Sequence, residues 1–430
     1  MKTYYYKKLS AQKINELLKR PAIDLESKMK QVKPIIEDVK KNGIHAVIKY
    51  AKKFDGLKSG ALKVTADEIN NSEKFLAPEI KSAIDKAAKN IYKFHLQQKP
   101  QSYSIETLPG VVCTRKHIPI DSVGLYIPGG SAVLVSTMLM LGIPAKIAGC
   151  QKVVVCSPAK DEEISAELLY AAKVCGIKEF YKVGGSQAIA LMAYGTGSIE
   201  KVNKIFGPGN QYVTAAKAVV STDPDSAGCT IDMLAGPSEV LIIADETASP
   251  EFAAADLLSQ AEHGTDSQSI LLTTSETFAK KVIAEVDKQL KVLPRKELAK
   301  KSLQNSFILV FENVNDAVEF SNKYAPEHLI LNIKNSSGYL KKIRNAGSVF
   351  IGEYSPESAG DYASGTNHSL PTYGYAKSIG GVTVESFMKT TTFQKLTKSG
   401  LKKLSPVITK LAEVEKLDAH ANAVKIRMNK

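Results

Sequence analysis

Arginine is scarce in this chain, although the chain is strongly basic. Its 430 residues carry 57 lysines and arginines against 44 aspartates and glutamates, a formal net charge of +13, yet only five of the basic residues are arginine. Recognition of bases and phosphates favours the planar fork of arginine, whereas scattered lysine mostly solvates a surface. The composition therefore argues against a nucleic-acid binder and predicts a basic surface that helps to attract anionic ligands.

Paired cysteines and an apolar leader are also missing. The five cysteines are an odd number without CxxC spacing, and they lie in or beside apolar segments such as VVVCSP. Such cysteines act as small hydrophobes, which argues against a disulfide framework and favours a reducing, cytoplasmic location. The N-terminal MKTYYYKKLS lacks the apolar core of a signal peptide. The one uncharged run of membrane-spanning length, 122–145, is interrupted by prolines and glycines and is typical of a strand, a turn and a buried helix, so no membrane association is expected.

Short apolar runs alternate with helical stretches through most of the chain. A first series of strands, SVGLYIP, KVVVCSP, EFYKVGG and KIFGPG, begins near residue 121, and a second, EVLIIAD, SILLTT, SFILVF, HLILNI and GSVFIG, begins near residue 238. The helical stretches are 133–148, 163–175, 187–194 and 210–221 in the first series, and 250–262, 276–291, 313–324 and 336–345 in the second. This alternation predicts parallel, doubly wound sheets.

We therefore predict an α/β protein with two doubly wound, incomplete Rossmann-like parallel-sheet domains, a helical N-terminal region and a small helical C-terminal tail. The expected units are a helical region at 1–120 that joins the main body, a nucleotide-binding domain at 121–236, a catalytic domain at 237–381 and the tail at 382–430. The tail carries a motif histidine, His420, and must dock on its own body or on a second subunit to be useful.

Three glycine-rich turns follow strands of the first series: YIPGGSA (126–132), VGGSQA (183–188) and FGPGN (206–210). Each precedes a helix, whose first N–H groups can bind a phosphate. None matches GxGxxG, so any one of them could equally be a tight turn between strand and helix. Because ligands bind beyond the carboxyl ends of parallel strands, three such turns at one edge favour a nucleotide site.

Histidine is rare, but four of the seven lie in dense clusters within the last 170 residues: SQAEHG, APEHL, TNHSL and LDAHANA. Gln260 and His263 stand three apart at the end of an expected helix and so share one face. With Asp361 and the other histidines they offer nitrogen and oxygen ligands for a borderline metal such as zinc. A hydrogen-bonded histidine at a helix end is the alternative for this pair. Glu415 and His420, if on one helix, would lie roughly 140° apart, so their spacing alone makes no ligand face.

Glu327 and His328 form a candidate acid/base pair. Pro326 ends the preceding helix and leaves both residues at the mouth of the sheet. Adjacent residues entering a strand point to opposite sides, so the two could serve different steps of one reaction. A structural ion pair is the alternative.

Together these segments resemble the histidinol dehydrogenase family over essentially the whole chain. The most telling segment is IDMLAGPSE (231–239), which looks like the family's signature. SQAEHG, APEHL, SAGDYASGTNHSLPT and the AH near the C-terminus recur in the family in this order and spacing, as do GLYIPGGSA, VGGSQA and FGPGN.

The resemblance implies an enzyme that oxidises L-histidinol through L-histidinaldehyde to L-histidine with two NAD⁺ and one water. It implies one Zn²⁺ per subunit, held by Gln260, His263, Asp361 and His420, and NAD⁺ contacts from Tyr126, Gln187 and Asn210. Substrate contacts would come from Ser238, His328, His368, Glu415 and the four zinc ligands. It also implies a homodimer in which the tail of one subunit completes the site of the other. We expect His328 to take the alcohol proton and Glu327 to activate the water.

Two other functions remain compatible with the residues. A zinc hydrolase or amidase could use the same clusters, with Glu327 as general base, and would need no nucleotide. A non-catalytic basic binding module would use the charge of +13, but it leaves the histidine clusters unexplained.

Overall fold

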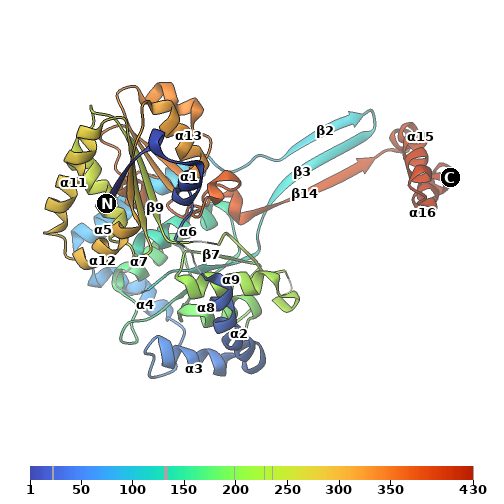
Figure 1. The fold of residues 1–430 in the computed structure, drawn as a ribbon. Coiled ribbons are helices and arrows are strands. Elements are labelled where there is room, and N and C mark those ends of the chain that lie inside the picture. Colours follow the sequence, from blue (N-terminus) through green and yellow to red (C-terminus); the bar gives the residue numbers. More distant parts are fainter. Residues whose placement is uncertain (22–23, 130–133, 198, 227, 235, 430) are drawn as a thin grey trace.

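Two parallel sheets organise the body of the protein (Figure 1). The computed structural model describes residues 1–430 except 22–23, 130–133, 198, 227, 235 and 430. The larger sheet has the order β1-β11-β10-β9-β12-β13 and the smaller one β6-β5-β4-β7-β8. Their strands are β1 (Lys2–Tyr5), β4 (Ser122–Tyr126), β5 (Lys152–Ser157), β6 (Glu179–Lys182), β7 (Lys204–Phe206), β8 (Thr230–Ile231), β9 (Glu239–Ala244), β10 (Gln268–Thr273), β11 (Phe307–Val310), β12 (His328–Asn332) and β13 (Ser348–Ile351). Every pairing within these two sheets is parallel.

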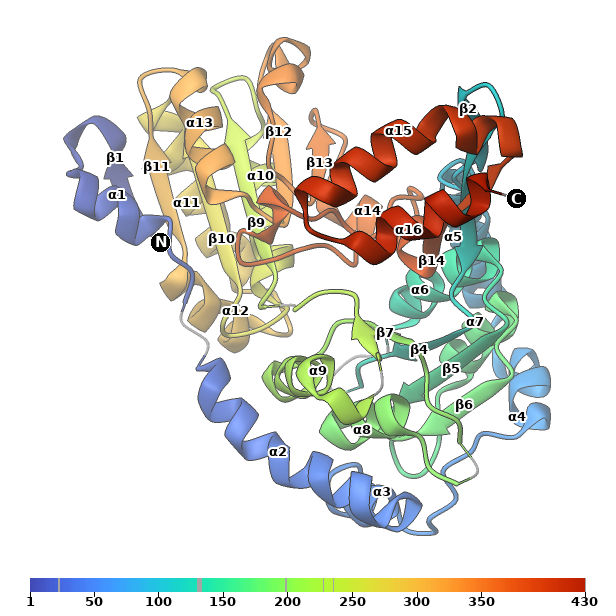
Figure 2. The ribbon, with the colours of Figure 1, turned by 90° about the vertical axis from the view of Figure 1, so that its right-hand side faces the viewer.

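Helices cover both faces of each sheet (Figure 2). Those of the two α/β units are α6 (Val135–Ala148), α7 (Ala166–Cys175), α8 (Gly185–Tyr194), α9 (Gln211–Thr222), α10 (Pro250–Ala261), α11 (Glu276–Leu290), α12 (Lys296–Ser302), α13 (Val314–Tyr324) and α14 (Glu357–Tyr362). The predicted strands and helices of both series are confirmed, except that 336–345 forms a 3-10 helix, Ser336–Lys342. The fold class is confirmed with them.

Alternating side chains explain why each sheet needs two covers. On the larger sheet, Ile242 and Ile330 pack on one face, whereas Leu241 and Leu329 pack on the other. All six residues of β9 are buried, as expected for a central strand of a parallel sheet. No helix in the described part of the chain has both the length and the apolar character to cross a bilayer.

The N-terminal region joins the two sheets. Its first strand, β1, pairs with β11 at the edge of the larger sheet. The helices that follow are α1 (Ala11–Leu17), α2 (Leu25–Asn42), α3 (Ile44–Phe54), α4 (Ala66–Asn71) and α5 (Pro78–Leu96), and α2 and α3 pack against α8 and α9 beside the smaller sheet. The N-terminal residues therefore reach both halves of the body.

An antiparallel arm projects from the body and carries the tail (Figure 1). It consists of β2 (Tyr103–Leu108), β3 (Val111–Pro119) and β14 (Met388–Leu396), in the order β14-β3-β2, and ends in α15 (Lys398–Val414) and α16 (Asp418–Met428). The prediction of helical structure at 103–119 and 388–396 was wrong. These segments are rich in β-branched and aromatic residues. Strand β14 pairs with β3, which lies far from it in the sequence, and local patterns do not reveal such a long-range strand pairing.

Candidate active site

Glu327 and His328 are anchored on one residue of the neighbouring strand. The carboxylate Oε2 of Glu327 accepts the backbone N–H of Glu239 at 2.9 Å, and the ring Nδ1 of His328 lies 3.1 Å from the Glu239 carbonyl oxygen. Both side chains are buried. Their side chains converge, with Nδ1 of His328 3.7 Å from Oε2 of Glu327, and do not point away from each other as predicted. The alternation of a strand does not apply to this pair, because β12 begins at His328 and Glu327 still belongs to the loop after Pro326.

This anchoring selects the tautomer of His328. A carbonyl oxygen can only accept, so Nδ1 carries the proton and Nε2 carries the lone pair. Nε2 is buried without a hydrogen-bond partner among the described residues, and Oδ1 of Asp361 lies 3.7 Å away from it. Burial lowers the pKa of His328 to about 3, which keeps the ring neutral. Nε2 is therefore the ring atom at which a proton could be accepted, although burial makes that protonation less favourable than in water.

A cluster of metal-ligand type adjoins this pair. One ligand atom from each of His263, Glu357 and Asp361 lies within 4.8 Å of the other two. Gln260 is fully buried, and neither atom of its amide has a hydrogen-bond partner in the described structure. Gln260 stands in the last turn of α10, and its backbone carbonyl oxygen accepts the backbone N–H of His263 at 3.2 Å. Two predicted ligands, His263 and Asp361, are thus brought together, and a third, Gln260, stands three residues before His263 with a buried, unpartnered amide.

Glu357 was not predicted as a site residue. It stands four residues before Asp361 on α14, so both carboxylates share one face of that helix. Its Oε1 lies 3.4 Å from Nδ1 of His328, whereas Oε2 has no partner among the described residues. The four-residue spacing from Asp361 was the signal that could have revealed it.

The buried carboxyl groups of this cluster would be stabilised in their ionised form by a bound cation. Burial raises the pKa of Glu327 and of Glu357 well above the usual range, and it raises the pKa of Asp361 to about 6. A bound cation would stabilise the ionised carboxylates and supply the partner that the Gln260 amide lacks. Amide oxygen, imidazole nitrogen and carboxylate oxygen together suit a borderline divalent ion. The described residues therefore fit a metal ion.

The two predicted site residues of the C-terminal tail do not lie in this cluster. Glu415 and His420 are exposed at the end of the arm, away from the cluster of their own chain (Figure 1). The assumption that they share a helix was wrong. Lys416 adopts a left-handed conformation, with φ of 59°, which ends α15 at Val414, and α16 begins only at Asp418.

Ser238 and His368 border the cluster. Ser238 directly precedes Glu239 and is partly buried. The ring of His368 donates from Nδ1 to the carbonyl oxygen of Asp361 at 3.1 Å, and its Nε2 lies 3.2 Å from the hydroxyl of Thr137. His368 thereby links α14, beside the larger sheet, to α6 of the α/β unit that contains the smaller sheet.

The glycine-rich turns meet at the carboxyl ends of neighbouring strands. Tyr126 ends β4, and its hydroxyl oxygen accepts the N–H of Gly185 at 3.1 Å. Gln187 lies in the first turn of α8 and is buried, whereas Asn210 is exposed and caps α9 by accepting two backbone N–H groups. A side chain at Gly207 would collide with the carbonyl of Tyr126, which shows how closely the FGPGN turn approaches β4. Residues 130–133 of the first turn lie outside the described structure.

An arginine from the N-terminal region braces the residue that anchors the acid/base pair. Nε and Nη2 of Arg20 each donate to one carboxylate oxygen of Glu239, both at 2.9 Å, and the guanidinium lies 3.6 Å from the ring centre of Tyr324. The side chains of Arg20 and Glu239 are only 7% and 2% exposed. No local motif pointed to Arg20, because its partner lies more than two hundred residues away.

Replacing Arg20 should destabilise the folded protein. Arg20→Met leaves the Glu239 carboxylate buried and unpaired, which is expected to lower the free energy of unfolding by about 3 to 5 kcal/mol in urea denaturation. Arg344→Met is the matched control, because its pair with Glu319 is 58% and 51% exposed and such pairs contribute below about 1 kcal/mol. Equal destabilisation by the two variants would contradict the bracing role.

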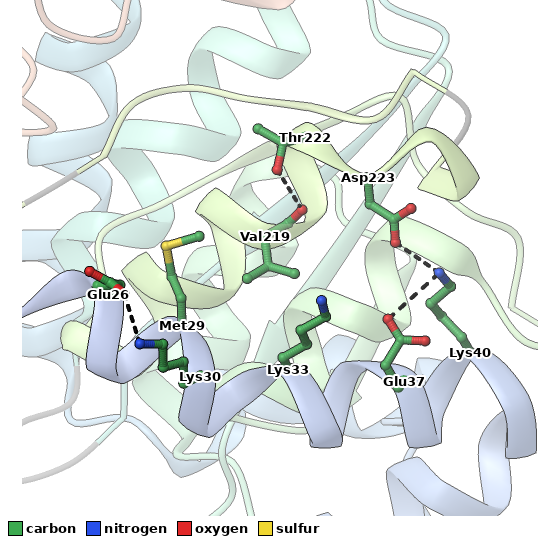
Figure 3. Close-up of a pocket in the computed structure, with 9 residues that line it drawn as sticks. All are labelled: Glu26, Met29, Lys30, Lys33, Glu37, Lys40, Val219, Thr222 and Asp223. Carbon is green, nitrogen blue, oxygen red and sulfur yellow. Dashed lines mark hydrogen bonds and ion pairs between the residues drawn. The ribbon is translucent and has the colours of Figure 1, made fainter.

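A separate groove lies between α2 and α9 (Figure 3). Its volume is about 460 Å³, and none of the predicted site residues lines it. The charges along it are largely paired, since Lys40 contacts Asp223 at 2.8 Å and Lys30 contacts Glu26 at 2.7 Å. It offers no unpaired catalytic group comparable to His328.

Comparison with known proteins identifies relatives along the whole chain. Residues 18–428 match the family model described as histidinol dehydrogenase. A histidinol dehydrogenase of Vibrio parahaemolyticus serotype O3:K6 is 52% identical over 431 residues, 100% of this chain and 99% of its own. One of Bacteroides thetaiotaomicron is 52% identical over 415 residues, 96% of each chain. The crystal structure of histidinol dehydrogenase from Elizabethkingia anophelis is 50% identical, with a TM-score of 0.94 over 100% of this chain and 98% of that one.

Proposed function

The chain belongs to the histidinol dehydrogenase family, an oxidoreductase family, and we propose that it oxidises L-histidinol through L-histidinaldehyde to L-histidine with zinc and NAD⁺. One observation carries the proposal: Nε2 of His328, buried without a hydrogen-bond partner in the described structure, lies 3.7 Å from Oδ1 of Asp361, which forms a cluster of metal-ligand type with His263 and Glu357. The buried Gln260 amide also has no partner among the described residues. We assign 121–236 to nucleotide binding and 237–381 to catalysis. We place the enzyme in the cytoplasm, where its five free cysteines stay reduced.

The proposed metal ligands are Gln260, His263 and Asp361 of one chain and His420 of a second copy. When bound, zinc would orient the substrate through its imidazole and amine nitrogens. The protein's share of this work is to hold a dry, acidic pocket in which a substrate with two basic nitrogens is favoured. Ser238, His368 and Glu415 are the further proposed substrate contacts.

Each oxidation removes a proton and a hydride from the substrate. Nε2 of His328 accepts the hydroxyl proton of histidinol. Tyr126, Gln187 and Asn210 would hold NAD⁺, which when bound would supply the hydride acceptor. The aldehyde then needs one water. The carboxylate of Glu327 takes a proton from that water as its oxygen adds to the aldehyde carbon, and protonated His328 returns its proton to the aldehyde oxygen, which gives the hydrate. The ring of His328, neutral again, then takes a hydroxyl proton of the hydrate as the second hydride leaves. The products are the histidine carboxylate and two NADH.

Exposed apolar surface supports a homodimer with shared sites. The tail presents Val407, Leu411 and Val414 with exposed fractions of 56%, 58% and 71%. On the body, Phe252 and Tyr354 are also exposed and contact each other beside α10, the helix of Gln260. Apolar patches of this kind mark surfaces that bury one another. A second copy would bring the tail, with His420 and Glu415, to the cluster that lacks them.

The decisive test is NADH formation with L-histidinol, followed by absorbance before and after removal of metal with a chelator. We expect two NADH for each histidinol consumed and loss of activity on chelation, restored by zinc. Hydrolysis of an amide or ester without any NADH would favour the zinc hydrolase. Salt-sensitive retention on nucleic acid without turnover would favour the binding module.

Glu327→Gln should separate the two oxidations. The amide keeps an oxygen that can accept the Glu239 N–H, so the geometry is preserved while the proton-accepting carboxylate is lost. We expect oxidation of histidinaldehyde to fall about 10²-fold and oxidation of histidinol far less, measured separately with each substrate. Glu246→Gln, an exposed position, is the control. Equal losses in both half-reactions would remove Glu327 from the water-activating role.

A further inference from the structure

Asp55 connects the N-terminal region to the turn between β6 and α8. It directly follows α3, and its carboxylate Oδ2 accepts the backbone N–H of Gly184 at 2.9 Å. The same oxygen accepts the side-chain N–H of Gln187 at 3.1 Å. On the other side of this turn, the hydroxyl of Tyr126 accepts the N–H of Gly185. Two proposed nucleotide contacts, Tyr126 and Gln187, are thus held around one turn, and Asp55 holds the second of them.

The turn is shaped to fit this carboxylate. A Cβ atom at Gly184 would lie 2.7 Å from Oδ1 of Asp55 and 2.6 Å from the ring of Pro158, so no side chain fits between them. Gly185 has a φ of +60°, a conformation that other residues rarely adopt. Both glycines of the VGGSQA motif are therefore explained by the closeness of Asp55 and by the backbone path, without a phosphate.

The charge of Asp55 also restricts which part of a nucleotide can approach. Anions favour the N-terminus of a helix because its first N–H groups are unpaired and the helix dipole is positive there. Here Asp55 already receives the N–H of Gly184, the N-cap residue that directly precedes α8, and places a negative charge at that end. A pyrophosphate would be repelled, whereas a ribose hydroxyl or a base would not.

We propose that Asp55 is a positioning residue of the nucleotide site, which fixes the Gln187 amide and the Gly184–Gly185 turn to receive an uncharged part of NAD⁺. This rests on the proposed function, because it takes NAD⁺ as the nucleotide. Asp55 acts through Gln187 and the turn and takes no part in proton or hydride transfer. Its loss should therefore weaken nucleotide binding without slowing the bound complex.

The test is steady-state kinetics of the zinc-loaded, full-length enzyme carrying Asp55→Ala. With two hydrogen bonds to a carboxylate removed, we expect the KM for NAD⁺ to rise about tenfold. We expect kcat at saturating NAD⁺, the KM for histidinol and the zinc content to stay within about twofold of wild type. An unchanged KM for NAD⁺, or a loss confined to kcat, would overturn the positioning role.

Asp55→Asn separates geometry from charge. Its amide oxygen can accept both hydrogen bonds, so we expect a KM for NAD⁺ within about threefold of wild type. A KM as high as that of Asp55→Ala would show that the charge itself is required and would overturn the inference. A KM below wild type in either variant would show that Asp55 repels a bound phosphate, which also contradicts it.

Asp38→Ala is the matched control for loosening of the N-terminal region. Asp38 accepts hydrogen bonds from Asn42, Lys49 and Tyr50 within α2 and α3 and does not contact the turn. We expect a lower melting temperature and an unchanged KM for NAD⁺. A KM for NAD⁺ raised as much as in Asp55→Ala would show that general destabilisation causes the effect and would overturn the inference. A wild-type enzyme that forms no NADH from histidinol would instead overturn the proposed function.

Discussion

A His328→Asn enzyme should lose about 10²- to 10⁴-fold in kcat for both the alcohol and the aldehyde step, the range typical of a removed general base. The asparagine amide nitrogen can occupy the place of Nδ1 and still donate to the Glu239 carbonyl, so the anchoring on β9 is kept. What disappears is Nε2, the buried nitrogen whose lone pair has no partner among the described residues. The loss is therefore chemical and not structural.

The zinc content of the His328→Asn enzyme distinguishes a general base from a metal ligand. The purified His328→Asn enzyme is expected to contain as much zinc as wild type, measured by atomic emission, and to bind histidinol with little change. His45→Asn, at an exposed position in α3, serves as the control for removal of a histidine. A His328→Asn enzyme that loses its zinc would make His328 a metal ligand, and a small loss of kcat would remove it from proton transfer.

Much of the body could be predicted from local pattern. Strands such as β9 are almost entirely apolar because they are buried on both faces, and the strands of the first series are followed by turns rich in glycine or proline. Both sheets could therefore be predicted from the sequence. The arm could not be predicted in this way. Every residue of β2 is exposed, and β14 pairs with β3 from a distant part of the chain, so neither strand carries the signature of a core.

The same distinction applies to the site. Gln260 and His263 were predicted to share one face because three residues at a helix end span less than one turn, and α10 indeed ends at Ala261, just before His263. The approach of α14 to this helix end depends on the packing of the whole larger sheet, so the proximity of Asp361 came from the family resemblance and not from spacing. Arg20 was missed because it acts only through a distant partner brought near by the fold. Glu357 was missed although its spacing from Asp361 was a local signal, because only the fold brings it close to His328.

If His420 is a metal ligand, as we propose, its place at the end of the arm calls for a second copy, and mixed dimers test this proposal directly. Neither a His420→Asn nor a His328→Asn subunit can form an intact site with its own kind. In a mixed dimer with exchanged tails, the body of the His420→Asn chain receives the intact tail of the His328→Asn chain. One of the two sites is then complete, and the other carries both substitutions.

Co-expression of the two variants with different affinity tags yields the mixed dimer after two purification steps. We expect its kcat per dimer to be about half that of wild type, and random unpurified mixtures to reach about a quarter, at least 10-fold above either variant alone. The exposed position of His420 at the end of the arm is the physical reason, because the tail is held away from its own body. A mixed dimer no more active than its parents would mean that each tail serves its own chain. The arm would then have to fold back onto the body, a rearrangement that difference distances between spin labels on α16 and α10 would detect.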